Sequence, residues 1–171
     1  MTTTTTTTAD ILTAGKATFT LEGKGRRFTF RIERVESRDR GSIYFAKLLK
    51  GPSNEHDYVY LGVYDPVNGW IHLTKKSQFA DDTECARALR WYVSLVWSGS
   101  EIEIEQHGFR VHWSNECQRC GKMLTVLSSI DARLGPECIK KVKPSRAALG
   151  RGSIPRRRAT SLEREFEMTI R

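Results

Sequence analysis

The sequence predicts an α+β protein in which an antiparallel sheet with one packed helix is followed by a small cysteine-containing module and a basic tail. Three observations predict this order. Polar and apolar residues alternate in short runs over the first half of the chain, which is typical of antiparallel strands with one buried face. The period then changes to that of a helix. Three closely placed cysteines follow, and positive charge accumulates after them.

Five alternating runs are expected to be strands, and turn sequences such as Gly23-Lys24-Gly25 and Asp65-Pro66 separate them. The runs cover residues 18–21, 28–35, 43–49, 58–63 and 70–73. Ahead of them, residues 2–8 are all Thr and offer nothing to bury, so we expect residues 1–15 to be a disordered Thr-rich N-terminus. The strands and the helix that follows are expected to form one sheet and helix domain over residues 16–111.

One helix is predicted after the strands. Its apolar residues recur at i, i+3, i+7, i+10 and i+11, which places them on one face of a helix that can pack across the sheet. Asp82 or Thr83 can cap its start, and Gly99 suits its C′ position. The apolar face consists of Ala86, Leu89, Val93, Val96 and Trp97.

Two further strands, at 101–105 and 109–113, are expected to form a hairpin that leads into the cysteines.

Cys117 and Cys120 form a Cys-x-x-Cys pair, and Cys138 follows after seventeen intervening residues. Zinc prefers four thiolate or imidazole ligands at tetrahedral angles, and a Cys-x-x-Cys turn directs two sulfurs at one ion. Gly121 permits the tight backbone of such a turn, and Pro136 suits the first turn of a helix that carries Cys138. We therefore expect a structural Zn²⁺ in a treble-clef-like module over residues 112–143.

Three cysteines leave one zinc ligand to be found. His112, five residues before Cys117, is the favoured fourth ligand, and Cys85 in the predicted helix is the alternative. Free cysteines are among the most buried residues, which favours a core position for Cys85. The other histidines, His56, His72 and His107, lie farther from the cysteines along the chain.

A redox dithiol at Cys117 and Cys120 is the competing interpretation of the cysteines. Such a pair normally lies between a strand and a helix in a βαβ unit, and no such unit is predicted here. A zinc ion closed by three thiolates and an imidazole has no position for substrate water, and the deaminase, phosphate-loop and nucleophile-elbow motifs are not met. We therefore do not expect an enzyme.

The cysteine segment also resembles an uncharacterised zinc-motif domain that is common in phage and bacterial proteins. The resemblance covers residues 112–142, and it implies a metal site and a phage origin without assigning an activity. One departure is that Arg133 stands where the resembling sequences usually have the first Gly of Gly-x-Gly-Pro. The matching residues are His112, Cys117, Cys120, Gly121, Leu124, Thr125, Ser129, Ile130, Gly135, Pro136 and Cys138.

Positive charge is concentrated at the C-terminal end of the chain. Residues 140–171 hold ten Lys or Arg and three Glu, so this stretch carries +7 of the net +8. Such asymmetry indicates a polyanionic partner, and a solvated tail without a partner is the alternative interpretation. The tail 144–171 also contains apolar residues, Leu162, Phe166 and Ile170, that could lie on one side of a short helix. The residues expected to contact DNA or RNA phosphates are Lys140, Lys141, Lys143, Arg146, Arg151, Arg156, Arg157 and Arg158.

Two functions follow from these features. The first is a non-enzymatic, zinc-stabilised nucleic-acid-binding accessory protein, phage-encoded if the resemblance holds, that contacts phosphates with little base readout. The alternative is a phage protein-binding module that inhibits a host defence complex of the CRISPR type, with the tail docked on an acidic or nucleic-acid-binding host surface. Neither a secretory signal nor an apolar run of about 20 residues is present, so a cytoplasmic location without membrane contact is expected.

Overall fold

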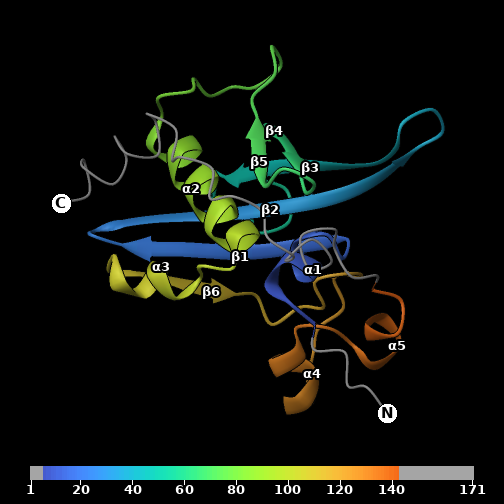
Figure 1. Ribbon diagram of the computed structural model, residues 1–171. Helices are drawn as coiled ribbons and strands as arrows, with labels where there is room; N and C mark the ends of the chain where they lie inside the picture. The colour runs from blue at the N-terminus through green and yellow to red at the C-terminus, as the bar shows by residue number, and fades with distance from the viewer. Residues whose placement is uncertain (1–5, 143–171) are drawn as a thin grey trace.

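The computed structural model describes residues 6–142, and it has the predicted α+β class (Figure 1). Six antiparallel strands form one sheet in the order β5-β4-β3-β2-β1-β6. None of the helices in this part of the chain is long and apolar enough to cross a membrane. The strands are β1 Lys16–Gly23, β2 Arg26–Ser37, β3 Gly41–Leu49, β4 Tyr58–Asp65, β5 Trp70–His72 and β6 Phe109–Trp113. The helices are α1 Thr8–Leu12, α2 Glu84–Ser98, α3 Ile102–Gln106, α4 Leu127–Ala132 and α5 Pro136–Ile139.

All five strand runs predicted in the first half of the chain are confirmed. In β1 and β2, Phe19 lies opposite Phe30 and Leu21 lies opposite Phe28, so the apolar members of both strands share one face. That face packs under α2, and the ring of Phe19 lies 4.8 Å from the ring of Tyr92. The β2–β3 hairpin is the longest, and it projects beyond the rest of the sheet (Figure 1).

Helix α2 confirms the predicted helix and its end. Thr83 is its N-cap residue, and Gly99 is its C-cap in the left-handed region at φ 73°, which glycine adopts without steric cost. The helix crosses one face of the sheet (Figure 1) and buries most of its inward side. Cys85 is only 6% exposed and belongs to this core, as expected for a structural cysteine.

The predicted strand at 101–105 is wrong, because these residues turn into helix α3. Their alternation is misleading, since Ile104 is buried while Ile102 is 73% exposed. The open edge of β1 is instead taken by β6, with Phe19 opposite Trp113. The chain leaving α2 at Gly99 has to fold back to reach that edge, and one helical turn makes the reversal.

The predicted disorder of residues 1–15 is wrong for residues 8–15. A capping box starts α1, in which the backbone N–H of Asp10 donates to Thr7 Oγ1 (3.2 Å) and that of Thr7 donates to Asp10 Oδ2 (2.8 Å). Ala9 and Leu12 join the main core, whereas Ile11 joins a second apolar cluster around the cysteines. Helix α1 therefore lies between the sheet and the cysteine module, as Figure 1 shows.

Candidate metal centre

Three of the four cysteines come together at one point. Cys117 and Cys120 lie in the loop after β6, and Cys138 lies in α5, which begins at Pro136 as predicted. Their Sγ atoms all lie within 4.8 Å of one another, and none is in a disulfide. Sulfurs bound to one tetrahedral zinc at 2.3 Å lie about 3.8 Å apart, so a small contraction of this cluster suffices to hold a metal ion.

The loop that carries Cys117 and Cys120 has the backbone of a metal-binding turn. The N–H of Cys117 donates to the carbonyl of Lys122 (2.8 Å), and the N–H of Gly121 donates to the carbonyl of Cys117 (2.8 Å). Gly121 has φ 76°, a conformation that a side chain would disfavour. Glu116 and Met123 pair across the loop in an antiparallel bridge. The two sulfurs are thus held by a closed turn.

The surroundings of Cys117 favour its thiolate, which is the form that binds metal. Burial raises the pKa of Cys117, but N–H groups of Gly135, Cys120 and Arg119 donate to its sulfur and lower the pKa to about 7. The Gly135 N–H lies 3.4 Å from Cys117 Sγ. Burial raises the pKa of Cys138, the neighbouring Cys120 and Cys117 raise it further, and Arg119 lowers it in part. A bound cation would favour the thiolate form of the cysteines.

His112, the predicted fourth ligand, is not among the side chains that cluster with the three cysteines. It lies on β6 opposite Thr20, and its Nε2 is 3.0 Å from Glu22 Oε2. The physical reason is strand geometry: Trp113 packs against both apolar clusters, and successive side chains of a strand point to opposite faces. His112 therefore points away from the cysteines.

The alternative ligand, Cys85, is not in the cluster either, since it lies in the first turn of α2 and is buried in the main core. His107 packs edge-on against Trp91, and His72 and His56 lie beside acidic neighbours. All histidines and cysteines of the chain fall within residues 6–142, and in this range only the three cysteines form a group of metal-binding side chains. A fourth ligand would approach from the side of Cys120, which is exposed.

Gln118, the first residue between the paired cysteines, fastens the module to the sheet. Its side chain is fully buried, at 0% exposure. Its Oε1 accepts from the backbone N–H of Thr18 in β1 (2.7 Å), and its Nε2 donates to the carbonyls of Glu116 (2.6 Å) and Ser114 (3.1 Å). The backbone N–H of Lys16 donates to the Gln118 carbonyl (2.7 Å). The sequence did not point to Gln118, because the two positions between the cysteines of a Cys-x-x-Cys pair can hold any residue.

Arg133 explains the departure from the Gly-x-Gly-Pro pattern. It ends α4 in the left-handed region at φ 58°, where glycine is the residue without strain. Its backbone carbonyl accepts from the N–H of Gln118 (3.0 Å). Its guanidinium lies over the Trp113 ring, 4.6 Å from the centroid, a cation–π contact worth about 0.5–1 kcal/mol. The arginine keeps the backbone turn and adds a charged group beside the module.

Of the predicted phosphate-binding residues, the structure places only Lys140 and Lys141, both exposed just after α5. Lys140 Nζ pairs with Glu137 Oε1 at 3.0 Å. The tail and its possible short helix lie outside the described residues, as do the remaining predicted contacts, Lys143, Arg146, Arg151, Arg156, Arg157 and Arg158. The structure adds three basic residues around the cysteines that the sequence reasoning did not select, namely Lys16, Arg119 and Lys122.

Comparison with known proteins identifies this part of the chain only. Residues 112–143 match a family of unknown function, DUF6011. These residues begin within β6 and end just after α5, so the match covers all three clustered cysteines. No curated protein and no solved structure matches the chain. The match is therefore to a segment, and it carries no assigned activity.

Proposed function

We propose that this protein is a non-enzymatic nucleic-acid-binding accessory protein whose cysteine module is stabilised by zinc. The observation that carries the proposal is a group of five basic residues that lie within three residues of a clustered cysteine in the chain or pack against the cysteine loop. We name it the basic rim, and it consists of Lys16, Arg119, Lys122, Lys140 and Lys141.

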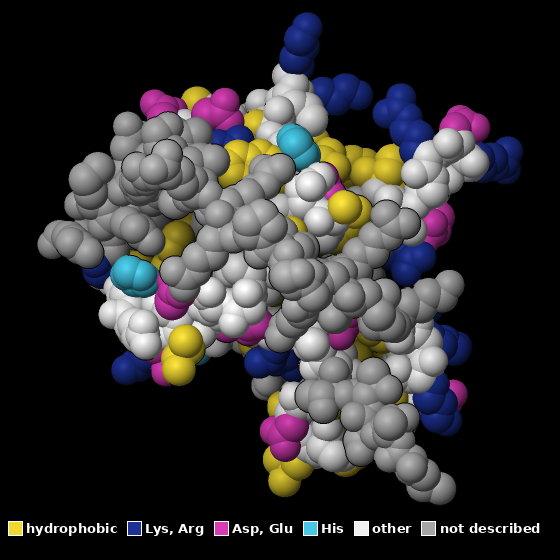
Figure 2. Space-filling view, viewed as in Figure 1, with side chains coloured by type: hydrophobic (Ala, Val, Ile, Leu, Met, Phe, Trp, Pro, Cys, Tyr) yellow, Lys and Arg dark blue, Asp and Glu magenta, His cyan; other side chains and the backbone are white. Residues whose placement is uncertain are grey.

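Two residues of the basic rim, Lys16 and Arg119, lie against the cysteine loop or its sulfurs. The Lys16 side chain lies against Gly121, with Nζ 3.3 Å from where a Cβ would be. Arg119 reaches the sulfur of Cys138. Figure 2 shows Lys and Arg side chains at the right edge of the module, in the lower part of the view. Clustered cations bind nucleic-acid phosphates without base specificity.

Zinc is the ion that the ligand set favours, because three thiolates suit a borderline-soft, redox-inert cation. Three sulfur donors would also reduce the ion's ability to activate water. Among the described residues, the cluster of metal-binding side chains consists of three cysteines, and it holds no histidine or carboxylate that could act as a general base. A structural ion that holds the basic rim in shape is therefore a better fit than a catalytic one.

The salt dependence of binding tests the proposal. Affinity for a duplex and for a single strand is measured by fluorescence anisotropy from low to high salt, with the zinc-loaded full chain. We expect log affinity to fall linearly with log salt, with a slope of about −0.9 per phosphate contacted on duplex DNA and about −0.7 on a single strand. Replacing Arg156, Arg157 and Arg158 by Gln should make the slope shallower. No binding at low salt would refute the function.

A second candidate function is supported by exposed apolar side chains on the same module. Met123 is 68% exposed and Leu127 is 77% exposed, and Val126 and Ile139 are also exposed. Figure 2 shows hydrophobic side chains at the lower tip of the molecule, beside α4. Exposed apolar groups gathered in one place are typical of protein-binding surfaces. They support the alternative of a protein-binding module.

A pull-down from nuclease-treated bacterial lysate separates the two functions. A protein partner that remains after nuclease treatment, and that is lost on replacing Met123 and Leu127 by Ser, would support the protein-binding module. Loss of every partner on nuclease treatment would support nucleic-acid binding. The basic rim, which is unchanged in the Ser variant, serves as the internal control.

A further inference from the structure

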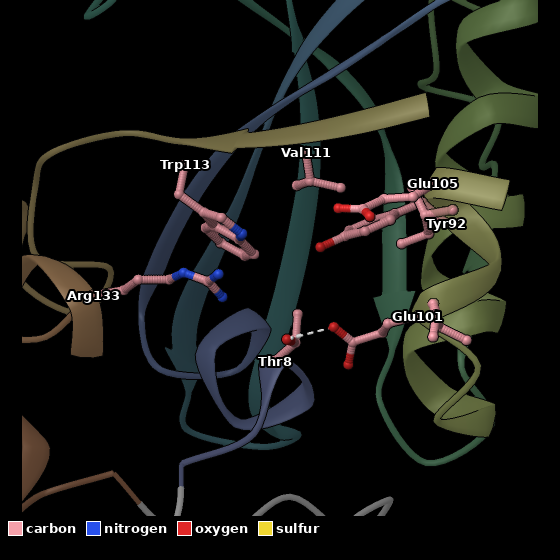
Figure 3. A pocket seen from close by; sticks show the side chains of 9 residues that line it. Thr8, Tyr92, Glu101, Glu105, Val111, Trp113 and Arg133 are labelled. Carbon is pink, nitrogen blue, oxygen red and sulfur yellow. Dashed lines mark hydrogen bonds between the residues drawn. The ribbon is translucent and has the colours of Figure 1, made fainter. Parts of the chain in front are cut away.

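A cavity of about 360 Å³ lies between the sheet and the cysteine module. Figure 3 shows that α1, α2, α3, β6 and the end of α4 each contribute a wall. Its volume falls in the range of small-ligand sites. The lining residues are Thr8, Tyr92, Glu101, Ile102, Ile104, Glu105, Val111, Trp113 and Arg133.

The two ends of the cavity carry opposite charge. On one side, the Arg133 guanidinium lies on the Trp113 ring and points into the cavity. It has no hydrogen-bond or ion-pair partner among residues 6–142. On the other side, the carboxylates of Glu101 and Glu105 face the same space (Figure 3). Thr8 Oγ1 donates to Glu101 Oε2 at 2.7 Å and holds that carboxylate in place.

The Tyr92 hydroxyl lies between the two ends and points into the cavity (Figure 3). Burial raises the pKa of Tyr92 far above its ordinary value, the nearby Glu101 raises it further, and Arg133 opposes this only in part. The hydroxyl therefore stays protonated and can donate a hydrogen bond. It adds a neutral polar group to the charged walls.

These walls restrict the ligand. A simple anion would be repelled by Glu101 and Glu105, and a simple cation would be repelled by Arg133. An apolar ligand would take water from all three charged groups and offer them no hydrogen bond in exchange, which is costly even though Glu101 keeps its bond from Thr8. The ligand must offer acceptors to the guanidinium and donors to the carboxylates, and a planar shape suits an aromatic and guanidinium wall.

We propose that this cavity binds a guanine base of an unpaired nucleic-acid strand. Guanine presents two adjacent acceptors, N7 and O6, which match two guanidinium N–H groups. Its neighbouring edge presents N1–H and N2–H₂, which match carboxylate oxygens. This inference rests on the proposed nucleic-acid-binding function and adds a base preference to phosphate contacts that have none.

The metal centre positions Arg133 in this scheme. The Gln118 N–H fixes the Arg133 carbonyl, and Gly135, two residues on, donates to Cys117 Sγ. The left-handed conformation of Arg133 is thus kept by the cysteine loop, and its side chain is aimed at the cavity. Metal binding and base selection are expected to depend on each other.

The test uses the zinc-loaded full chain and short oligothymidylates whose central base is guanine, adenine, hypoxanthine or 7-deazaguanine. We expect guanine to bind about tenfold more tightly than adenine, the size of one good bidentate base contact. Hypoxanthine lacks the N2 amino group and 7-deazaguanine lacks N7, so each should bind more weakly than guanine. Guanosine monophosphate should compete, and adenosine monophosphate should not.

Variants locate the preference. Arg133→Gly keeps the backbone turn and removes the guanidinium, and Glu101→Gln removes one charged acceptor; each should abolish the guanine preference. Arg38→Gln, at the tip of the β2–β3 hairpin, makes the same charge change elsewhere and should leave it intact. Equal binding of all four oligonucleotides would overturn the guanine site and leave the proposed function standing. If no oligonucleotide binds even at low salt, the proposed nucleic-acid-binding function is overturned. Binding of guanosine monophosphate would then show, independently of that function, whether the cavity accepts guanine.

Discussion

The backbone N–H of Thr18 in β1 donates to Oε1 of Gln118, in the cysteine loop, across 2.7 Å. One buried amide thereby joins two parts of the chain that are distant in sequence. The Nε2 of Gln118 also donates hydrogen bonds, to two backbone carbonyls of the same loop. The cysteine module is therefore built onto the sheet, and its position depends on Gln118 as well as on a metal ion.

Replacing Gln118 by Leu should destabilise the protein strongly. The substitution leaves the buried Thr18 N–H without a partner and takes a donor from two part-buried loop carbonyls. A buried group that loses its hydrogen bond costs about 1–3 kcal/mol. We expect the free energy of unfolding to fall by about 3 kcal/mol, measured by urea denaturation of the zinc-loaded protein. Ser128→Ala, an exposed change on α4, is the matched control. Equal unfolding curves for the two variants would show that Gln118 does not hold the cysteine module on the sheet.

Metal analysis should find one zinc per chain, and only the clustered cysteines should be needed to hold it. Cys117→Ser, Cys120→Ser and Cys138→Ser should each lower the zinc content measured by mass spectrometry of the dialysed protein. His112→Ala and Cys85→Ala should keep it, because neither side chain lies with the three sulfurs. Loss of zinc from the His112 variant would mean that β6 rearranges around the ion.

Two neighbouring residues of α1 should separate metal affinity from fold stability. Ile11 packs in the apolar cluster with Cys117 and Cys138, whereas Leu12 packs in the sheet core. Either change to Ala should cost about 2–5 kcal/mol of unfolding free energy. Only Ile11→Ala should weaken zinc binding in a competition with a chromogenic chelator. The same zinc affinity in both variants would contradict the division of α1 between two clusters.

Arg133 allows a paired stability test. Gly at this position relieves a left-handed strain of about 1–2 kcal/mol but loses about 0.5–1 kcal/mol of cation–π attraction. The free energy of unfolding of Arg133→Gly should therefore lie within about 1 kcal/mol of that of the original protein. Arg133→Ala keeps the strain and loses the contact, so it should be about 1 kcal/mol less stable than the Gly variant. Thermal and urea denaturation measure both, and the reverse order would argue against the φ value of Arg133.

The basic rim predicts a graded salt response. Replacing Lys140 and Lys141 by Gln should reduce the magnitude of the log–log salt slope by about 1–2 for duplex DNA, depending on how many of the two contact phosphate. Arg27→Gln, on an exposed end of β2, is a control for net charge. A slope that changes equally in the control would locate the contacts outside the basic rim.

The sequence predicts much of this fold because two periodicities are unambiguous. Polar and apolar residues alternate in β1 and β2, turn sequences separate the strands up to His72, and α2 has one apolar face between a cap and Gly99. Helix α1 was missed because five residues show no period, and its order comes from burial of Ile11 and Leu12 by distant segments. Alternation alone also misassigned 101–105, where tertiary packing decided the outcome.

At the metal site, spacing predicted the three cysteines but not the fourth ligand. Cys-x-x-Cys is a local constraint, so the sequence contains it, and Pro136 marks the helix that brings Cys138. His112 met the spacing requirement, yet the pairing of β6 with β1 decided which way it points. Gln118 and Arg133 acquire their roles only through contacts made after folding, which no short motif encodes.

The place of α1 between two apolar clusters has a consequence for biosynthesis. Ile11 is translated before Cys138, which belongs to the same apolar cluster, and all six strands of the sheet are translated between these two residues. The nascent N-terminal segment thus waits with part of its apolar surface uncovered. A metal ion that needs all three clustered cysteines could be bound only after Cys138 has been translated, and therefore only after every strand of the sheet.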